Sequence, residues 1–155
     1  MQGVGFLLLA GGQSRRMGGG DKNQLNLGGK SVLRHILDRV DRAGAPTAIN
    51  ANGDPLRFEG YGLPVIADVV DGYAGPLAGI LTGLEWIATY HPKCTHMISL
   101  ATDAPFLPSD LAHRLYARLG RDAVIVQAQS NGQRHPVFAI WPVALAADLR
   151  QAVCE

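Results

Sequence analysis

The chain has 155 residues, of which 47% are hydrophobic and 17% are charged, and its formal net charge is +1 at pH 7. This length and apolar content fit one globular domain with a single core. The near-neutral charge excludes a global electrostatic attraction to nucleic acid or to a membrane surface, so any anion site has to be local. The apolar run at residues 6–10 is too short to span a bilayer, and no basic residue precedes it, so no signal peptide is predicted there.

The two cysteines, Cys94 and Cys154, are far apart in sequence and form no CxxC pair. This spacing favours structural thiols in a reducing compartment over a metal or redox site. The cytoplasm is therefore the expected location.

The first part of the chain predicts a strand, a long loop and a helix. Residues 4–10 form a continuous apolar run that stops at glycines, which is typical of a strand buried on both faces. Residues 11–30 are rich in Gly and polar side chains and are predicted to be a loop. Ser31 can cap a helix that runs to about Ala43, with Gly44 at its end.

Strands and helices continue to alternate along the chain. Further strands are predicted at residues 47–51, 63–67, 97–101, 123–128 and 137–141, and further helices from Pro76, after a Ser109 cap and from Pro142. This order predicts an α/β fold with a three-layer, mostly parallel Rossmann-like sheet covered by helices on both faces. Ligands in such sheets bind at the carboxyl ends of the strands. The loop after Ala10, Asp68 and Asp103 fall there.

The loop after the first strand has the composition of an anion site. It reads Leu9-Ala10-Gly11-Gly12-Gln13-Ser14-Arg15-Arg16-Met17-Gly18, followed by Asp21-Lys22. Paired glycines let backbone N–H groups approach a base or a phosphate closely. Arg15, Arg16 and Lys22 can neutralise a polyphosphate. From composition alone, a solvated surface loop with ordinary charges is the alternative.

Two other glycine patterns do not match the motifs that they suggest. Gly28-Gly29-Lys30-Ser31 lacks the earlier glycine of a P-loop, because position 24 is Gln24. Gly3-Val4-Gly5 precedes the first strand, and Leu8 stands where a dinucleotide fingerprint needs its third glycine. The first pattern is interpreted as a turn that leads to the Ser31 cap.

The loop resembles the signature of nucleotidyltransferases that use a nucleoside triphosphate, and its Ala10-Gly11-Gly12 form resembles the molybdenum cofactor guanylyltransferases in particular. Further segments resemble that family in the same order: Leu27-x-Gly29-Lys30, Asn50-Ala51-Asn52, residues 65–68, residues 75–79, residues 102–108 and residues 135–138. The resemblance covers nearly the whole chain and implies a nucleotide-diphospho-sugar transferase-like fold. It also implies transfer of GMP from GTP to the phosphate of molybdenum-bearing molybdopterin, with release of pyrophosphate.

The resemblance implies roles for individual residues. The residues expected to contact GTP are Leu9, Ala10, Gly11, Gly12, Lys22, Asn50, Asp68 and Asp103. Catalysis would rest on positioning and charge neutralisation, with Arg15 and Lys22 at the phosphates and Asp103 binding Mg²⁺. Arg16 could serve either the phosphates or the acceptor, and His135 is expected on the acceptor side.

Elementary chemistry supports these roles but leaves alternatives open. Asp103 follows a buried strand, so its carboxylate could ligate Mg²⁺ together with phosphates, or it could be a turn residue. Asp68 could bond the nucleotide or simply end its strand. Asn50 offers a donor and an acceptor to a base edge or a ribose, whereas Asn52-Gly53 is a turn signal. Pro76 could direct a helix N-terminus at an anion or only begin the helix.

Members of the family usually continue some tens of residues past the position of Glu155, with an Asn-x-Asn element and a final helix on the acceptor side. We therefore predict a single nucleotidyltransferase domain over residues 1–155 without the family's C-terminal segment. Three functions stay open: the guanylyltransferase, a related cytidylyl- or sugar-phosphate nucleotidyltransferase, and a non-catalytic nucleotide-binding domain. The expected partners are GTP and molybdopterin, then cofactor insertion proteins and recipient apo-enzymes, with neither nucleic acid nor membrane.

Overall fold

The computed structural model describes residues 1–11, 26–72, 75–121 and 124–155. In these residues one six-stranded sheet has the order β5-β4-β1-β6-β8-β7, and a separate small hairpin is formed by β2 and β3. The strands of the sheet are β1 (Val4–Leu9), β4 (Thr47–Asn50), β5 (Val65–Ile66), β6 (His96–Ala101), β7 (Val126–Ser130) and β8 (Gln133–Pro142). The hairpin joins β2 (Asn26–Leu27) to β3 (Lys30–Ser31) through a turn at Gly28 and Gly29.

The sheet is mostly parallel, as predicted. β1 pairs in parallel with β4 and β6, and β4 pairs in parallel with β5. β8 runs antiparallel to β6, and β7 antiparallel to β8. The carboxyl ends of β5, β4, β1 and β6 therefore meet at one edge. The first residues of β8 and the last residues of β7 reach the same edge from the other direction.

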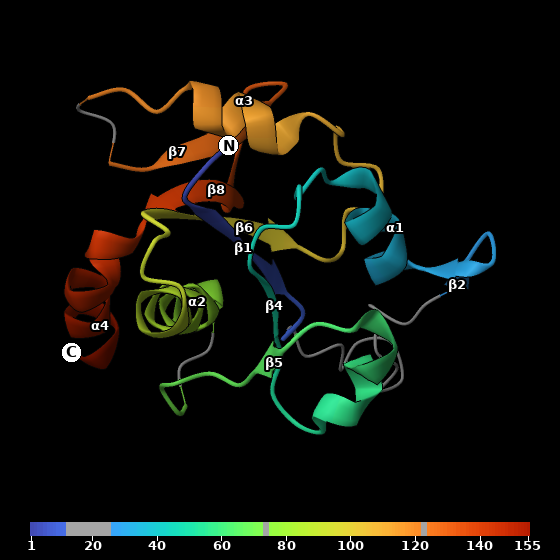
Figure 1. Ribbon diagram of the computed structural model, residues 1–155, viewed down its shortest axis with the longest axis horizontal. Coiled ribbons are helices and arrows are strands. Elements are labelled where there is room, and N and C mark those ends of the chain that lie inside the picture. The colour runs from blue at the N-terminus through green and yellow to red at the C-terminus, as the bar shows by residue number, and fades with distance from the viewer. Residues whose placement is uncertain (12–25, 73–74, 122–123) are drawn as a thin grey trace.

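Helices cover both faces of the sheet, which confirms the three-layer arrangement (Figure 1). The helices are α1 (Val32–Arg39), α2 (Pro76–Tyr90), α3 (Leu111–Ala117) and α4 (Ala146–Cys154). Alternate residues of β1 divide between two cores: Phe6 and Leu8 pack with α1 and α3, whereas Leu7 packs with α2. This division explains why the β1 sequence is apolar without interruption.

A buried polar contact fixes β8 against β6. The Ser99 hydroxyl is fully buried, donates to the Val137 carbonyl at 2.7 Å and accepts from the Trp141 indole N–H at 2.8 Å. A buried donor or acceptor is costly when it is left unpaired, so this pairing favours one register of β8. That register sets how far β8 extends past the carboxyl end of β6.

Several predicted boundaries were wrong. The helix capped by Ser31 ends at Arg39, because Val40 is extended and Ala43 and Gly44 are left-handed, although Val40 still packs into the core. Asp110 rather than Ser109 precedes α3, and no side chain caps that helix. β7 lies at Val126–Ser130 instead of 123–128, and β8 begins at Gln133, four residues before the predicted start.

A 3-10 helix at Pro55–Tyr61 is not predicted from the sequence. Asp54 caps it by accepting from the Leu56 N–H at 2.9 Å, Pro55 begins it, and Gly62 ends it in the left-handed conformation. Phe58 from this helix is fully buried against the α1 side of the sheet. In the described parts of the chain, no helix combines the length and apolarity that a membrane span requires.

Candidate functional site

The predicted site residues in the described chain gather at the carboxyl edge of the sheet. Leu9 ends β1 and Asn50 ends β4, while Asp68 and Asp103 each lie two residues beyond the ends of β5 and β6. Because these four strands are parallel neighbours in the order β5-β4-β1-β6, the four loops that follow them lie side by side. This is the edge at which α/β sheets bind ligands.

Hydrogen bonds join the loops at this edge. The Ala10 N–H donates to the Asn50 carbonyl at 2.9 Å, and the Ala51 N–H donates to the Ile66 carbonyl at 3.1 Å. On the other side of β1, the Thr102 hydroxyl donates to the Leu9 carbonyl at 3.0 Å. The two backbone bonds continue the parallel strand pairs by one residue, and the Thr102 side chain extends the connection, so the edge is joined from Ile66 to Thr102.

Asn50 is a buried polar residue at this edge, with 4% of its surface exposed. Its side-chain N–H group donates to Asp68 Oδ1 at 2.9 Å and to the Ile66 carbonyl at 3.2 Å. Its Oδ1 atom lies toward Gly79 and Gly11, because a Cβ added at those glycines would lie 2.3 Å and 3.6 Å from it. The amide therefore directs its acceptor into the space that the two glycines leave.

The Asp68 carboxylate is held at both oxygens. Oδ1 accepts from Asn50, and Oδ2 accepts from the Asn52 side-chain amide at 3.1 Å. The Asp68 N–H in turn donates to Asn52 Oδ1 at 2.9 Å, which closes a reciprocal pair between the two residues. Neighbouring amides therefore orient the Asp68 side chain, and its contact with the nucleotide stays a prediction.

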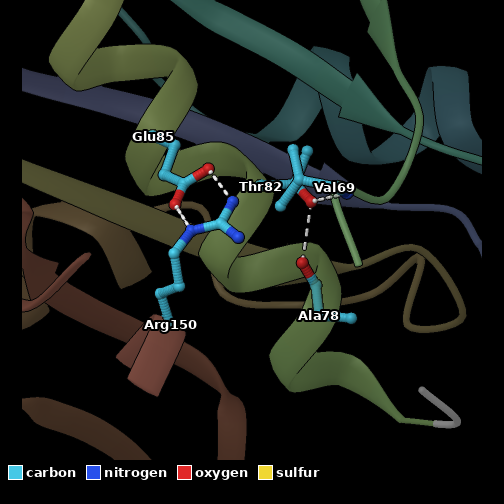
Figure 2. Close-up of polar contacts among 5 residues, drawn as sticks. All are labelled: Val69, Ala78, Thr82, Glu85 and Arg150. Carbon is cyan, nitrogen blue, oxygen red and sulfur yellow. Dashed lines mark hydrogen bonds and ion pairs between the residues drawn. The ribbon is translucent and has the colours of Figure 1, made fainter. Parts of the chain in front are cut away.

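The loop that carries Asp68 is also attached to α2 (Figure 2). The Val69 N–H donates to the buried Thr82 hydroxyl at 2.9 Å, and that hydroxyl donates to the Ala78 carbonyl at 2.8 Å. β5 has only two residues, so sheet hydrogen bonds do little to hold the chain that follows it. Side chains from β4's end and from α2 hold it instead.

Asp103 is exposed in the turn after β6, between two anchored residues. Thr102 is buried and bonded to Leu9, and the Leu107 carbonyl accepts from the Arg39 guanidinium at 2.6 Å. No hydrogen bond or ion pair joins the Asp103 carboxylate to another residue within 1–11, 26–72, 75–121 and 124–155. Within the described parts of the chain, no other residue occupies the Asp103 carboxylate oxygens, so they can bind a ligand.

A metal cage made of protein side chains alone is absent from the described residues, because no group of three or more His, Cys, Asp or Glu side chains could hold an ion there. Mg²⁺ needs less, since one or two carboxylates suffice when substrate phosphates and waters complete its octahedron. A single free carboxylate at the ligand-binding edge fits a metal that arrives with a nucleotide.

His135 and Arg134 lie within β8 instead of before it, which corrects their predicted place. The start of β8 and the end of β7 form a hairpin that reaches the carboxyl edge beyond β6. Across this hairpin a His135 ring nitrogen lies 2.7 Å from the Ser130 hydroxyl, and the His135 ring meets Phe138 edge-on. The acceptor-side role of His135 stays a prediction.

Four predicted site residues lie outside the described residues: Gly12, Arg15, Arg16 and Lys22. Gly11, the last described residue before them, is exposed and lies beside Asn50 and Ala51. The predicted start of a helix at Pro76 is confirmed, with Gly75 preceding it at φ 137°. Its proposed contact with an anion is untested.

Two residues that hold Asp68 and the residue after it, Asn52 and Thr82, are not predicted as site residues from the sequence. The Asn52-Gly53 pair predicts only a turn. One signal was present, because residues i and i+2 of an extended chain project to the same side, which places Asn50 and Asn52 together. No comparable signal marked Thr82, since its contact depends on how α2 packs against the loop after β5.

Together with this fold and this edge, a family match defines the class of the protein as a nucleotidyltransferase. The model of the MobA-like NTP transferase domain family matches residues 6–155 of the chain. The structure superimposes on the molybdopterin-guanine dinucleotide biosynthesis protein A of Archaeoglobus fulgidus with a TM-score of 0.72 at 20% identity, covering 97% of this chain and 73% of that one.

Sequence comparison narrows this class. The molybdenum cofactor guanylyltransferase of Mesorhizobium japonicum is 55% identical over 154 residues, which are 98% of this chain and 73% of that protein. The enzyme of the same name from Rhodopseudomonas palustris is 53% identical over 148 residues, covering 95% and 70%. The chain belongs to the molybdenum cofactor guanylyltransferase family.

Proposed function

We propose that this protein transfers GMP from GTP to the phosphate of molybdenum-bearing molybdopterin and releases pyrophosphate. The observation that supports this most is the meeting of Gly11, Asn50, Asp68 and Asp103 at one sheet edge, in a chain of this family. The names of the relatives reported above indicate the substrates, and the residues at this edge have side chains suited to binding a nucleotide.

The chemistry needs little covalent participation from the protein. A phosphate oxygen of the acceptor attacks the α-phosphorus of GTP in line, and the bond from that phosphorus to the β-phosphate oxygen breaks. The attacking oxygen is already anionic at neutral pH, so neither a general base nor a protein nucleophile is required. The protein contributes by aligning the two substrates and by neutralising charge that moves onto pyrophosphate.

Each residue of the edge has a part in this proposal. Backbone groups of residues 9–12, the Asn50 amide and the Asp68 carboxylate bind the nucleoside. Arg15 and Lys22 contact the phosphates, where a forked guanidinium and a mobile ammonium suit different oxygens. Asp103 would hold Mg²⁺, which when bound neutralises charge on the phosphates.

The acceptor side rests on fewer groups. Arg16 and His135 are the residues that we assign to it, and the β7–β8 hairpin brings His135 to the same edge as Asp103. The two cysteines, Cys94 and Cys154, are both free, which fits a reducing compartment such as the cytoplasm. The dinucleotide product would pass from this edge to insertion proteins and recipient apo-enzymes.

Calorimetric titration of GTP, CTP and ATP in the presence of Mg²⁺ tests the proposal. We expect selective binding of GTP and a loss of its Mg²⁺ dependence in Asp103→Asn, with turnover reduced roughly 10²- to 10³-fold when the charge is removed. Asp110→Asn is the matched control, because Asp110 is an exposed aspartate in the same segment and pairs only loosely, at 4.0 Å, with Arg114.

Three results would separate the alternatives. Selective binding of CTP would indicate a cytidylyltransferase. Binding of GTP without release of pyrophosphate, when molybdenum-bearing molybdopterin is supplied, would indicate a nucleotide-binding domain without catalysis. An equal loss of Mg²⁺ dependence in Asp103→Asn and Asp110→Asn would show that Asp103 is not the Mg²⁺ ligand.

A further inference from the structure

The segment that carries Asp68 has no regular secondary structure to hold it. β5 ends at Ile66 after two residues, and the chain then leaves the sheet. A side chain that binds a ligand has to be held within a fraction of an ångström by its surroundings. The structure therefore has to fix Asp68 by other means.

Two consecutive backbone N–H groups of this segment are bound by side chains from different elements. The Asp68 N–H donates to Asn52 Oδ1 at 2.9 Å, and the Val69 N–H donates to Thr82 Oγ1 at 2.9 Å. Asn52 follows β4, whereas Thr82 lies nearly two turns into α2 and is 3% exposed. The segment is thus attached on one side to the sheet and on the other to the helix layer.

Asn52 also acts on the carboxylate itself. Its Nδ2 donates to Asp68 Oδ2 at 3.1 Å while Asn50 donates to Oδ1 at 2.9 Å. With a donor on each oxygen, rotation of the carboxylate would break at least one bond. Each oxygen keeps a further lone pair, because a carboxylate has about four acceptor sites.

We infer that Asn52 and Thr82 are positioning residues for the nucleotide, acting through Asp68: Asn52 sets the rotation of its carboxylate, and Thr82 sets the place of its backbone. This inference rests on the proposed function, in which Asp68 touches GTP. The ligand groups that Asp68 can receive are N–H or O–H donors, because an ionised carboxylate only accepts. Guanine N–H groups and ribose hydroxyls have this chemistry.

Calorimetric titration of Mg²⁺-GTP against Asn52→Ala and Thr82→Val tests the inference. We expect about 10-fold weaker binding for Asn52→Ala, which removes two hydrogen bonds, and about 3-fold weaker binding for Thr82→Val, which keeps the shape of the side chain. Both effects should vanish in an Asp68→Ala background, because residues that act through one group are not additive.

Two controls separate positioning from a general loss of stability. Asp54→Ala removes the cap of the 3-10 helix from the same loop as Asn52 without touching Asp68. Arg150→Met removes the ion pair with Glu85, one turn along α2 from Thr82 and directed toward α4 (Figure 2). Both controls should keep wild-type affinity for GTP, and thermal unfolding of every variant reports whether it folds.

The outcomes bear on the two proposals separately. If wild-type protein binds no GTP, both the proposed function and this inference are overturned. If it binds GTP and Asn52→Ala binds equally well, the inference fails and the function stands. Weakening by Asn52→Ala that persists undiminished in the Asp68→Ala background would also overturn the inference, since Asn52 would then act by another route. Comparing GTP with ITP and with 2′-deoxy-GTP distinguishes base from ribose as the group that Asp68 accepts.

Discussion

Gly79 and Gly83 both lie where α2 packs closely against the sheet, but they contact different residues. A Cβ added at Gly79 would lie 2.3 Å from Asn50 Oδ1 and 2.8 Å from Leu9 Cδ2, both at the carboxyl edge. A Cβ added at Gly83 would lie 2.6 Å from Leu7 Cδ2 and 2.7 Å from Met97 Sδ, inside the core. Both glycines allow α2 to approach the sheet, but only Gly79 borders a residue assigned to the nucleotide.

We expect Gly79→Ala and Gly83→Ala to have similar effects on stability and different effects on binding. Each adds a methyl group to a packed contact, which costs about 1–3 kcal/mol, offset by up to about 1 kcal/mol from helix propensity. Gly79→Ala should in addition displace the Asn50 amide and weaken GTP binding by about tenfold or more. Urea unfolding and GTP titration of both variants measure the two effects, and equal losses of affinity would show that Gly79 acts only through packing.

At the scale of elements, the central strand β6 carries a group that responds to pH. His96 begins β6 between Val4 of β1 and Pro142 of β8, and its Nδ1 lies 2.9 Å from the Thr95 hydroxyl. Burial lowers the pKa of His96 below its ordinary value. The folded protein therefore favours the neutral imidazole, whereas the unfolded chain takes up a proton near pH 6.5, to within about a unit.

The sign of the pH dependence follows from this difference. Below a pH of about 6.5 the unfolded state binds more protons than the folded state, so the free energy of unfolding decreases as the pH falls. We expect the urea midpoint of the wild type to be lower at pH 5 than at pH 7, and the decrease to be smaller in His96→Gln. An unchanged slope in that variant would assign the acid sensitivity to other groups.

The positions of most strands and helices could be predicted from the sequence, whereas some element ends and the contacts between elements could not. Apolar runs and helix caps placed β1, β4, β6 and α2 to within about two residues, because burial and capping are local in sequence. The end of α1 was missed, since Val40 continues the apolar face after the helix has stopped. The role of Thr82 could not be predicted, because it depends on which elements become neighbours and no local pattern encodes that. Asn52 differs, since its spacing of two residues from Asn50 is a local signal, although the contact with Asp68 also needs β5 beside β4.

For the whole molecule, the arrangement of the site predicts how strongly a ligand should stabilise the fold. The loops after β1, β4, β5 and β6 meet at this edge. The Thr102–Leu9 hydrogen bond there joins two residues that are 93 positions apart in the sequence. A nucleotide bound at this edge, as proposed, would contact segments from both halves of the chain. Because the unfolded chain does not present this edge, binding should favour the folded state only.

Mg²⁺-GTP should therefore raise the temperature of unfolding of the entire domain in one transition. At a concentration 100 times Kd the added stability is about 2.7 kcal/mol. For a domain of this size that amounts to roughly 5–10 °C, measured by scanning calorimetry. CTP and ATP at the same concentration should give smaller shifts, and GTP without Mg²⁺ a reduced one. A shift of only one of two resolved transitions would show instead that the edge belongs to a part of the molecule that unfolds independently, and the four loops would then not act as one site.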